Sequence, residues 1–156
     1  MFISKRNFFF LAAMTYLSLG LDWQAHGGNR QAGDVSTDRE NVAIGGYDTV
    51  AYFTDGKPTQ GSSDHEFVWN GARWWFASGA HRDMFASQPE SYAPRFGGYC
   101  VMAMIDGARF RPDPEAWAIV DGRLYLSGDR EGIIAFQQDT SGNIRQADER
   151  WEALHK

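Results

Sequence analysis

Two segments of the chain each contain two runs of β-prone residues separated by a tight-turn dipeptide. Each segment predicts a β-hairpin. In the first, residues 65–76, Asn70-Gly71 separates two runs rich in aromatic residues. Asn-Gly is the dipeptide most typical of a two-residue hairpin turn. The pairs expected across this turn are Trp69 with Ala72, Phe67 with Trp74, and His65 with Phe76. The expected core face carries Phe67, Trp69, Trp74 and Phe76.

The second hairpin covers residues 117–126 and turns at Asp121-Gly122. Its apolar face is expected to hold Trp117, Ile119, Leu124 and Leu126. A two-stranded hairpin is only marginally stable in water. Both hairpins therefore need helices to pack on.

Three helices are predicted by apolar residues at helical spacing. The first runs from the capping residue Ser78 to Gln88 and ends before Pro89, and the others cover residues 130–138 and 141–154. The inward stripe of the first helix is Ala77, Ala80, His81, Met84 and Phe85. Hairpins interleaved with helices, without βαβ periodicity, predict a small single α+β domain. No internal repeat is evident in the sequence.

The first 42 residues show no such succession of hairpins and helices. Residues 1–20 have the anatomy of an export signal, with Lys5-Arg6 before an apolar run too short to span a membrane. Residues 4–9 also resemble a twin-arginine signal with Lys5 at the first arginine. Residues 21–42 are polar and predict a flexible tether, so the domain is expected at 43–154. The expected location is the periplasm, with a membrane tether if the leader is not cleaved.

Composition narrows the function classes. The chain is 43% hydrophobic and 15% aromatic, which is enough apolar surface for a core. Its formal net charge is −5, and an acidic chain without a basic stripe excludes a nucleic-acid binder. Phosphate-loop, dinucleotide-binding and nucleophile-elbow motifs are absent from the sequence. The oligomeric state is left open.

Several segments between residues 43 and 153 follow one another in a recognisable order. They are residues 46–53, 69–71, 75–76, 82–85, 89–94, 97–100, 113–117 and 121–126, which include Gly46-Tyr47-Asp48 and Gly97-Gly98-Tyr99-Cys100. Together they resemble the YHS-domain family in its exported bacterial branch. Asp48 is expected to make a turn hydrogen bond with the backbone.

The resemblance implies chemistry at one cysteine. Relatives in metal transporters carry metal-binding cysteines, but here the matching positions near 49–50 and 80–81 hold none, with His81 as the only substitute. In the exported branch the recurrent cysteine matches Cys100, and some members are selenoproteins there. This implies a role for Cys100 in redox chemistry or soft-metal binding.

The leading hypothesis is a periplasmic metal-binding module that acts as a carrier or sensor rather than an enzyme. Cys100 is the sole cysteine, and Cys100 and Met104 share a face whether residues 99–105 are helical or extended. Soft sulfur ligands select copper, or another transition metal, and the imidazole of His81 completes the expected site.

Two alternatives stay open. In a thiol redox protein, Cys100 cycles through a sulfenic acid or a mixed disulfide and takes its resolving thiol from a partner protein. In a non-catalytic interaction domain, Cys100 is a buried core residue, as free cysteines commonly are.

Overall fold

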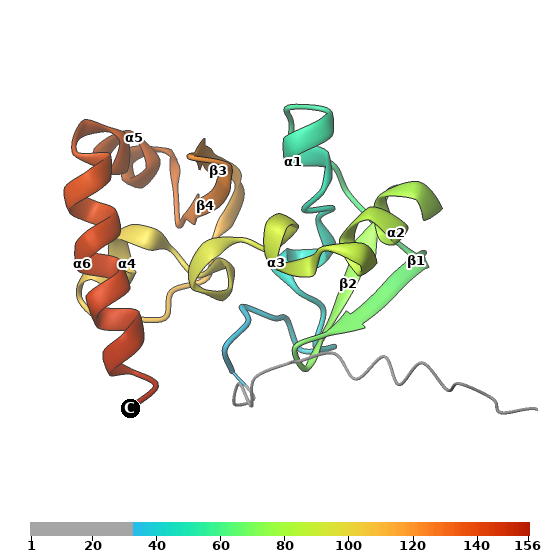
Figure 1. The fold of residues 1–156 in the computed structure, drawn as a ribbon, viewed down its shortest axis with the longest axis horizontal. Helices are drawn as coiled ribbons and strands as arrows, with labels where there is room; N and C mark the ends of the chain where they lie inside the picture. Colours follow the sequence, from blue (N-terminus) through green and yellow to red (C-terminus); the bar gives the residue numbers. More distant parts are fainter. Residues whose placement is uncertain (1–32) are drawn as a thin grey trace, which may run out of the picture.

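The computed structural model describes residues 33–156 (Figure 1), so the predicted export signal and the first part of the tether lie outside the described residues. The described chain is α+β, as predicted. In chain order its elements, with η for short 3₁₀ turns, are η1 (Ile44–Gly46), α1 (Ala51–Thr54), β1 (Ser62–Trp69), β2 (Ala72–Phe76), α2 (Gly79–Ser87), α3 (Pro89–Tyr92), η2 (Arg95–Gly98), α4 (Val101–Ile105), β3 (Asp113–Val120), β4 (Arg123–Ser127), α5 (Arg130–Gln138) and α6 (Thr140–Ala153).

Both predicted hairpins form, each as a separate two-stranded antiparallel sheet. The registers Trp69–Ala72 and Phe67–Trp74 are confirmed, as are Trp117–Leu126 and Ile119–Leu124. The predicted pair of His65 with Phe76 is wrong, because the register shifts between Ser62 and Glu66 and Phe76 pairs with Ser62. Residues 63–65 of β1 lie between Ser62 and Glu66, whereas the partners of these two residues, Phe76 and Trp75, are adjacent on β2. The turn dipeptide carries no signal for such an irregularity.

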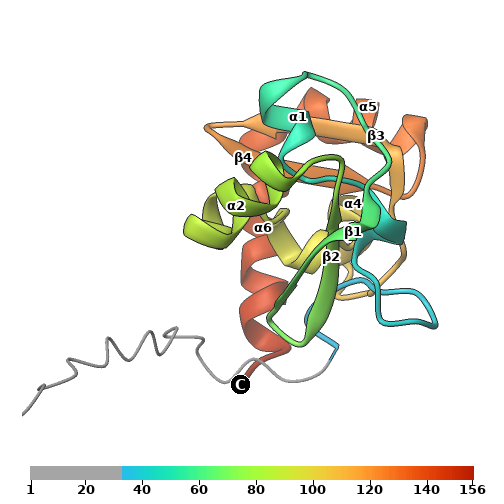
Figure 2. The ribbon, with the colours of Figure 1, turned by 90° about the vertical axis from the view of Figure 1, so that its right-hand side faces the viewer.

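One aromatic cluster holds the first hairpin against α2, and Figure 2 shows this helix beside the two strands. Phe85 of α2 is fully buried and its ring lies 5.0 Å from those of Trp74 and Phe76. Ser78 caps the helix as predicted, with its Oγ accepting from the backbone N–H of His81 at 3.1 Å. The hairpin and α2 therefore form one lobe with its own core.

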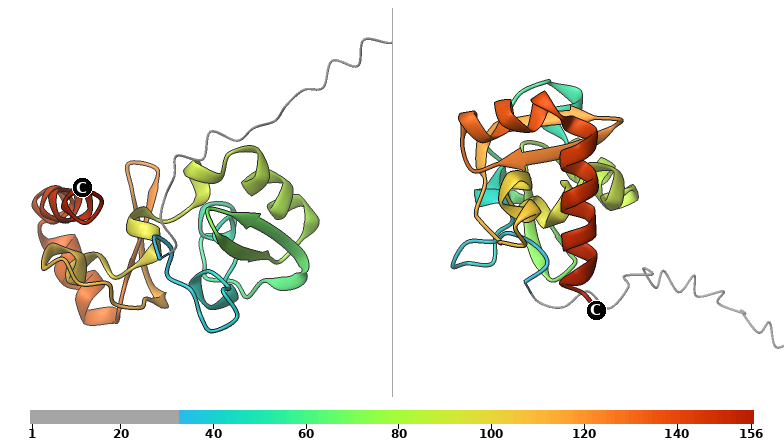
Figure 3. Two further views of the ribbon diagram at one scale, coloured as in Figure 1. Left: turned by 90° about the horizontal axis from the view of Figure 1, so that it is seen from below. Right: turned by 90° about the vertical axis from the view of Figure 1, so that its left-hand side faces the viewer.

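The second hairpin stands between two cores (Figure 3). Leu124 and Leu126 belong to the core of the first lobe, whereas Tyr125 between them packs in a second core with Phe96 and Phe136. The alternation of a strand points successive side chains to opposite faces. Strand β4 thus joins the first lobe to a second one that contains α4, α5 and α6.

The two lobes repeat one local fold. Strand β1 begins at Ser62 and β3 at Asp113, 51 residues later, and the same offset separates the starts of β2 and β4 and of α2 and α5. Equivalent elements have equal lengths, with 8, 5 and 9 residues respectively. Both hairpins also carry a register shift at the same place.

The turns that open the two repeats have the same backbone conformation. The φ angles are 53°, 61° and 81° at Ile44, Gly45 and Gly46, and 55°, 61° and 81° at residues 96–98. Asp48 and Cys100 follow these turns at equivalent positions. The sequence-based prediction of no internal repeat is wrong, because the similarity lies in dihedral angles and element lengths and leaves little trace in residue identity beyond Gly-Gly-Tyr.

Residues 34–36, which we call the strap, run across both of these turns and are buried. The backbone N–H of Ser36 donates to the carbonyl of Gly97 at 2.8 Å, and its carbonyl accepts from the N–H of Ile44 at 3.0 Å. The stretch predicted as tether thus packs on the domain from the strap onward. Within residues 33–156 we find no helix with the length and apolarity needed to cross a membrane.

Candidate functional site

Cys100 occupies the N-cap position of α4 and is 6% exposed. Its Sγ lies 3.5 Å from the backbone N–H donor of Ala103 and 3.5 Å from the Oγ of the buried Ser127. The N–H of Met104 donates to the carbonyl of Cys100, and the Met104 side chain is fully buried. Of the two conformations left open for residues 99–105, the structure has a helix over Val101–Ile105 with Cys100 as its N-cap.

His81 lies on α2 in the first lobe, and both of its ring nitrogens have partners there. Nδ1 is 2.7 Å from Oδ2 of Asp48, and Nε2 is 3.3 Å from Oγ1 of Thr54. Asp48 is fully buried and also accepts from the backbone N–H groups of Val50, Ala51 and Ala77. The predicted turn hydrogen bond of Asp48 is confirmed, and its carboxylate links α1, β2 and α2.

The predicted metal ligands therefore have different surroundings. Cys100 and Met104 share one turn of helix, whereas the ring nitrogens of His81 contact Asp48 and Thr54. Among residues 33–156, no group of three or more His, Cys, Asp or Glu side chains has an arrangement suited to a metal ion. Metal binding by Cys100, His81 and Met104 stays a prediction.

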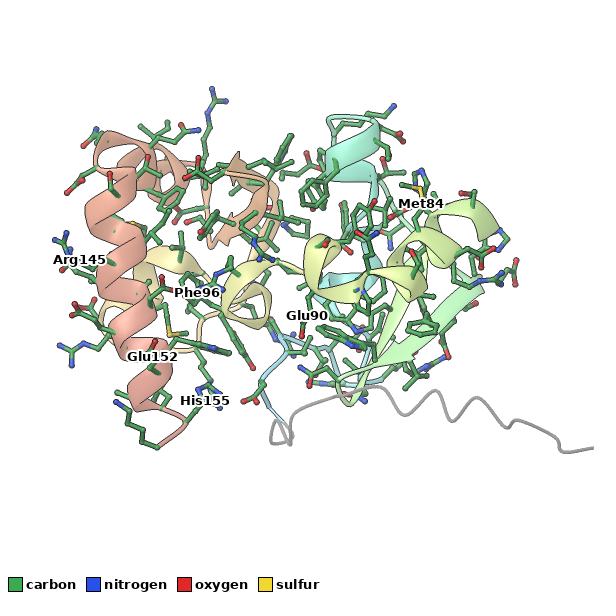
Figure 4. The ribbon with its side chains drawn as sticks, viewed as in Figure 1. Met84, Glu90, Phe96, Arg145, Glu152 and His155 are labelled. Atoms are coloured by element: carbon green, nitrogen blue, oxygen red, sulfur yellow. The ribbon has the colours of Figure 1, made fainter. Side chains whose placement is uncertain are left out.

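A groove of about 490 Å³ lies where the two lobes meet. Its aromatic lining is Trp69, Trp74, Phe96 and Trp151, and its polar lining includes Asp34, Asn70, Glu90, Arg95, Arg123, Glu152 and His155. Figure 4 shows Glu90 in α3, Phe96 in η2, and Glu152 and His155 at the end of α6. The strap, the tip of the first hairpin, η2 and α6 thus contribute to one concave surface.

Several polar side chains of the groove have hydrogen-bond or ion-pair partners within the protein. Arg95 forms an ion pair with Asp148, and Arg123 donates to the backbone carbonyl of Glu90 at 2.8 Å. His155 contacts the carbonyl of Trp151 through Nδ1 at 2.6 Å and Oδ1 of Asp34 through Nε2 at 2.8 Å. Such contacts fix side-chain orientation before any ligand arrives.

Asp34 is the most deeply buried charge in the groove. Its side chain is 2% exposed, and its Oδ1 also lies 3.6 Å from Nη2 of Arg109. Its Oδ2 has no hydrogen-bond partner within the described part of the chain. A buried carboxylate oxygen without a donor costs free energy.

The tyrosines near the two cores are not candidates for acid–base chemistry near neutral pH. Burial raises the pKa of Tyr125, which packs beside Phe96. Burial also raises the pKa of Tyr52, whose hydroxyl donates to the carbonyl of Pro114 at 2.8 Å. Both phenols stay protonated, which suits packing rather than catalysis.

Comparison of the chain with models of known protein families, with curated proteins and with solved structures gave no match. The resemblance to the YHS-domain family therefore stays a prediction. Sequence reasoning missed the groove, because its lining comes from segments as distant as Asp34 and His155. The sequence gives one indication of the groove, which is that Trp69 and Trp151 lie on apolar faces. The same placement indicates a buried core equally well.

Proposed function

We propose that the protein is a non-catalytic binding module and that the groove between the lobes is its binding site. The observation that carries the proposal is a cavity of about 490 Å³ at a junction of two lobes, lined by aromatic rings and braced polar groups. Small-molecule sites commonly have volumes of roughly 300–1,000 Å³, lie at such junctions and combine apolar walls with a few oriented polar groups.

We favour the groove over Cys100 as the functional site because its lining is more accessible to a ligand. Trp69 and Trp151 are both partly exposed on its walls. Cys100, by contrast, is 6% exposed, and its sulfur already contacts Ala103 and Ser127. A site that must capture a ligand needs open contact surface, and the groove offers more of it.

Truncating an aromatic wall should abolish ligand retention by the groove. We expect a small molecule to accompany the parent protein through purification, visible as an added mass in native mass spectrometry, and to be absent from Trp69→Ala. The matched control is Val68→Ala, since Val68 is the preceding residue, is 64% exposed and does not line the groove. Retention of the same ligand by Trp69→Ala, or no binding of any compound from a chemically diverse set by the parent, contradicts the proposal.

The second candidate is a redox-active thiol at Cys100. The observation in its favour is that the N–H of Ala103 donates to the sulfur at 3.5 Å and the Oγ of Ser127 also lies 3.5 Å from it, where either group can be the donor. Donors to sulfur stabilise a thiolate. Cys100 also occupies the position at which the first repeat holds the carboxylate of Asp48. The soft-metal carrier or sensor remains a proposal on the same cysteine, with Met104 beside it.

Cys100 should react slowly in the folded protein if the groove is the functional site. We expect its modification by a thiol reagent to be at least roughly 100-fold slower than in urea, because reaction then requires local opening.

Elemental analysis of protein purified without chelators, beside Cys100→Ala, is expected to give no metal in either. Rapid modification together with reaction toward peroxide favours the redox candidate, and near-stoichiometric copper in the parent alone favours the metal carrier.

A further inference from the structure

His155 links the C-terminal end of α6 to the strap (Figure 4). Its Nδ1 lies 2.6 Å from the carbonyl oxygen of Trp151, and its Nε2 lies 2.8 Å from Oδ1 of Asp34. The imidazole also packs on the indole of Trp151, with 4.5 Å between the ring centres. These contacts fix the ring between the helix and the strap.

Both ring nitrogens of His155 therefore face acceptors. A carbonyl oxygen and an ionised carboxylate oxygen accept hydrogen bonds and donate none, and a neutral imidazole has a single N–H to offer. Both contacts are hydrogen bonds only when the pair of His155 and Asp34 holds one proton more than a neutral imidazole beside an ionised carboxylate. The docked strap thus requires a bound proton.

Arg109 decides where this proton lies. Its Nη2 is 3.6 Å from the same Oδ1 of Asp34, and its guanidinium lies over the rings of Tyr99 and Trp151. A neighbouring positive charge favours the ionised form of a carboxyl group. The extra proton is therefore on His155, which is an imidazolium in the docked arrangement.

The other charges around His155 are exposed or already paired. On α6 and just beyond it, the side chains of Glu152 and Lys156 are exposed to solvent. Across the groove, Arg95 of η2 is paired with Asp148. Exposed and paired charges are screened by solvent or by their partners, so the buried carboxylate of the strap has the largest influence on the imidazole.

The remaining contacts of the strap are backbone hydrogen bonds. The N–H of Ser36 donates to the carbonyl of Gly97, and the carbonyl of Ser36 accepts from the N–H of Ile44. Backbone amides do not change charge with pH. The ionic contacts of Asp34 are therefore the part of the strap that responds to pH.

From this geometry we propose that His155 is a proton-sensitive latch on the groove. The imidazolium holds the strap against α6, and loss of its proton releases Asp34 and loosens the strap. Imidazole groups ordinarily change charge between about pH 5 and 8. Because docking binds a proton, docking is strongest at low pH and weakens as the pH rises through this range. The consequence for ligand access rests on the proposed function, since Asp34, Trp151 and His155 all line the groove.

Hydrogen exchange of the full chain, followed by NMR, tests the latch without a ligand. The protection factor of the Ser36 amide, which corrects for the intrinsic pH dependence of exchange, reports docking because this N–H donates to Gly97. We expect it to fall at least about fivefold between about pH 5.5 and pH 8, as one charge-assisted hydrogen bond is lost. The amide of Met104, which donates to Cys100 in α4, is the internal reference and should change by less than about twofold.

His155→Gln should remove the pH dependence and leave the Ser36 amide at or below the high-pH protection of the parent, because a glutamine side chain does not titrate. The matched control is His65→Gln, since His65 lies on β1 and does not line the groove. This control should keep the pH dependence of the parent.

A protection factor of Ser36 that does not change with pH in the parent overturns the inference, and so does a change that survives in His155→Gln. Neither outcome bears on the proposed function, which is tested separately by ligand retention in Trp69→Ala. The latch and the binding function can therefore fail independently.

Discussion

Gly97→Ala is expected to lower the free energy of unfolding by about 2–5 kcal/mol, from left-handed backbone strain and steric overlap together. Gly97 has φ +61°, and a Cβ placed there would lie 1.6 Å from the carbonyl oxygen of Asp34. That oxygen belongs to the backbone of the strap, so no side-chain rotation relieves the overlap. The strap must move, and the hydrogen bond from Ser36 to the Gly97 carbonyl is then lost.

The internal repeat supplies a matched control for this substitution. Gly45 occupies the equivalent position of the first repeat with the same φ of +61°, but a Cβ there meets nothing within 4 Å. Gly45→Ala should therefore cost only the strain of the left-handed backbone, about 1–2 kcal/mol. Urea denaturation of both variants measures the difference, which isolates the close approach of the strap.

Equal losses of stability in the two variants would show that the strap does not press on Gly97 in solution. If Gly97→Ala is the less stable variant, as expected, the groove should also be altered, since the strap carries Asp34 into its wall. Ligand retention by folded Gly97→Ala, measured by native mass spectrometry, should then be weaker than by Gly45→Ala. This links the stability of the turn to the geometry of the site.

Local signals in the sequence predict most of the elements. Asn70-Gly71 and Asp121-Gly122 both adopt positive φ angles at the hairpin turns, as type I′ turns require. The first predicted helix begins after its cap, Ser78, and ends at Ser87, before Pro89. These features depend on residues within a few positions of one another, and that is the range over which propensity and capping act.

Contacts between distant segments were not predictable in the same way. The groove depends on the pairing of Asp34 with His155, which are 121 residues apart. Likewise, the ring nitrogens of His81 contact Asp48 and Thr54, which are 33 and 27 residues away in the sequence. The helix that carries His81 packs on the first hairpin, and no local signal in the sequence indicates these partners. Side-chain chemistry alone does not say which lobe a residue faces.

Asp48→Ala should be the most destabilising substitution of a polar residue in the first lobe, at about 3–5 kcal/mol, because it removes one partner of a buried charged network. The carboxylate accepts from the backbone N–H groups of Val50, Ala51 and Ala77 and lies 2.7 Å from Nδ1 of His81. Its loss leaves the N–H groups of the fully buried Val50 and Ala51 without their acceptor. If Asp48→Ala does not fold, the same measurement is made on Asp48→Asn, whose side chain has a similar volume.

Cys100→Ala is the control, because Cys100 holds the equivalent position in the second repeat and caps α4 through one sulfur contact to Ala103. Its expected cost is about 1 kcal/mol, for a small lost volume and a weak acceptor. Urea denaturation should therefore rank the parent above Cys100→Ala, and Cys100→Ala above Asp48→Asn and Asp48→Ala. The reverse order would mean that the thiol, not the carboxylate, is the stabilising group at this repeated position. If Asp48 has a structural role and the cost at Cys100 is small, the two repeats use the same backbone turn for different purposes. In the first repeat the turn fixes a helix to its hairpin. In the second it places a thiol that the fold does not need for stability.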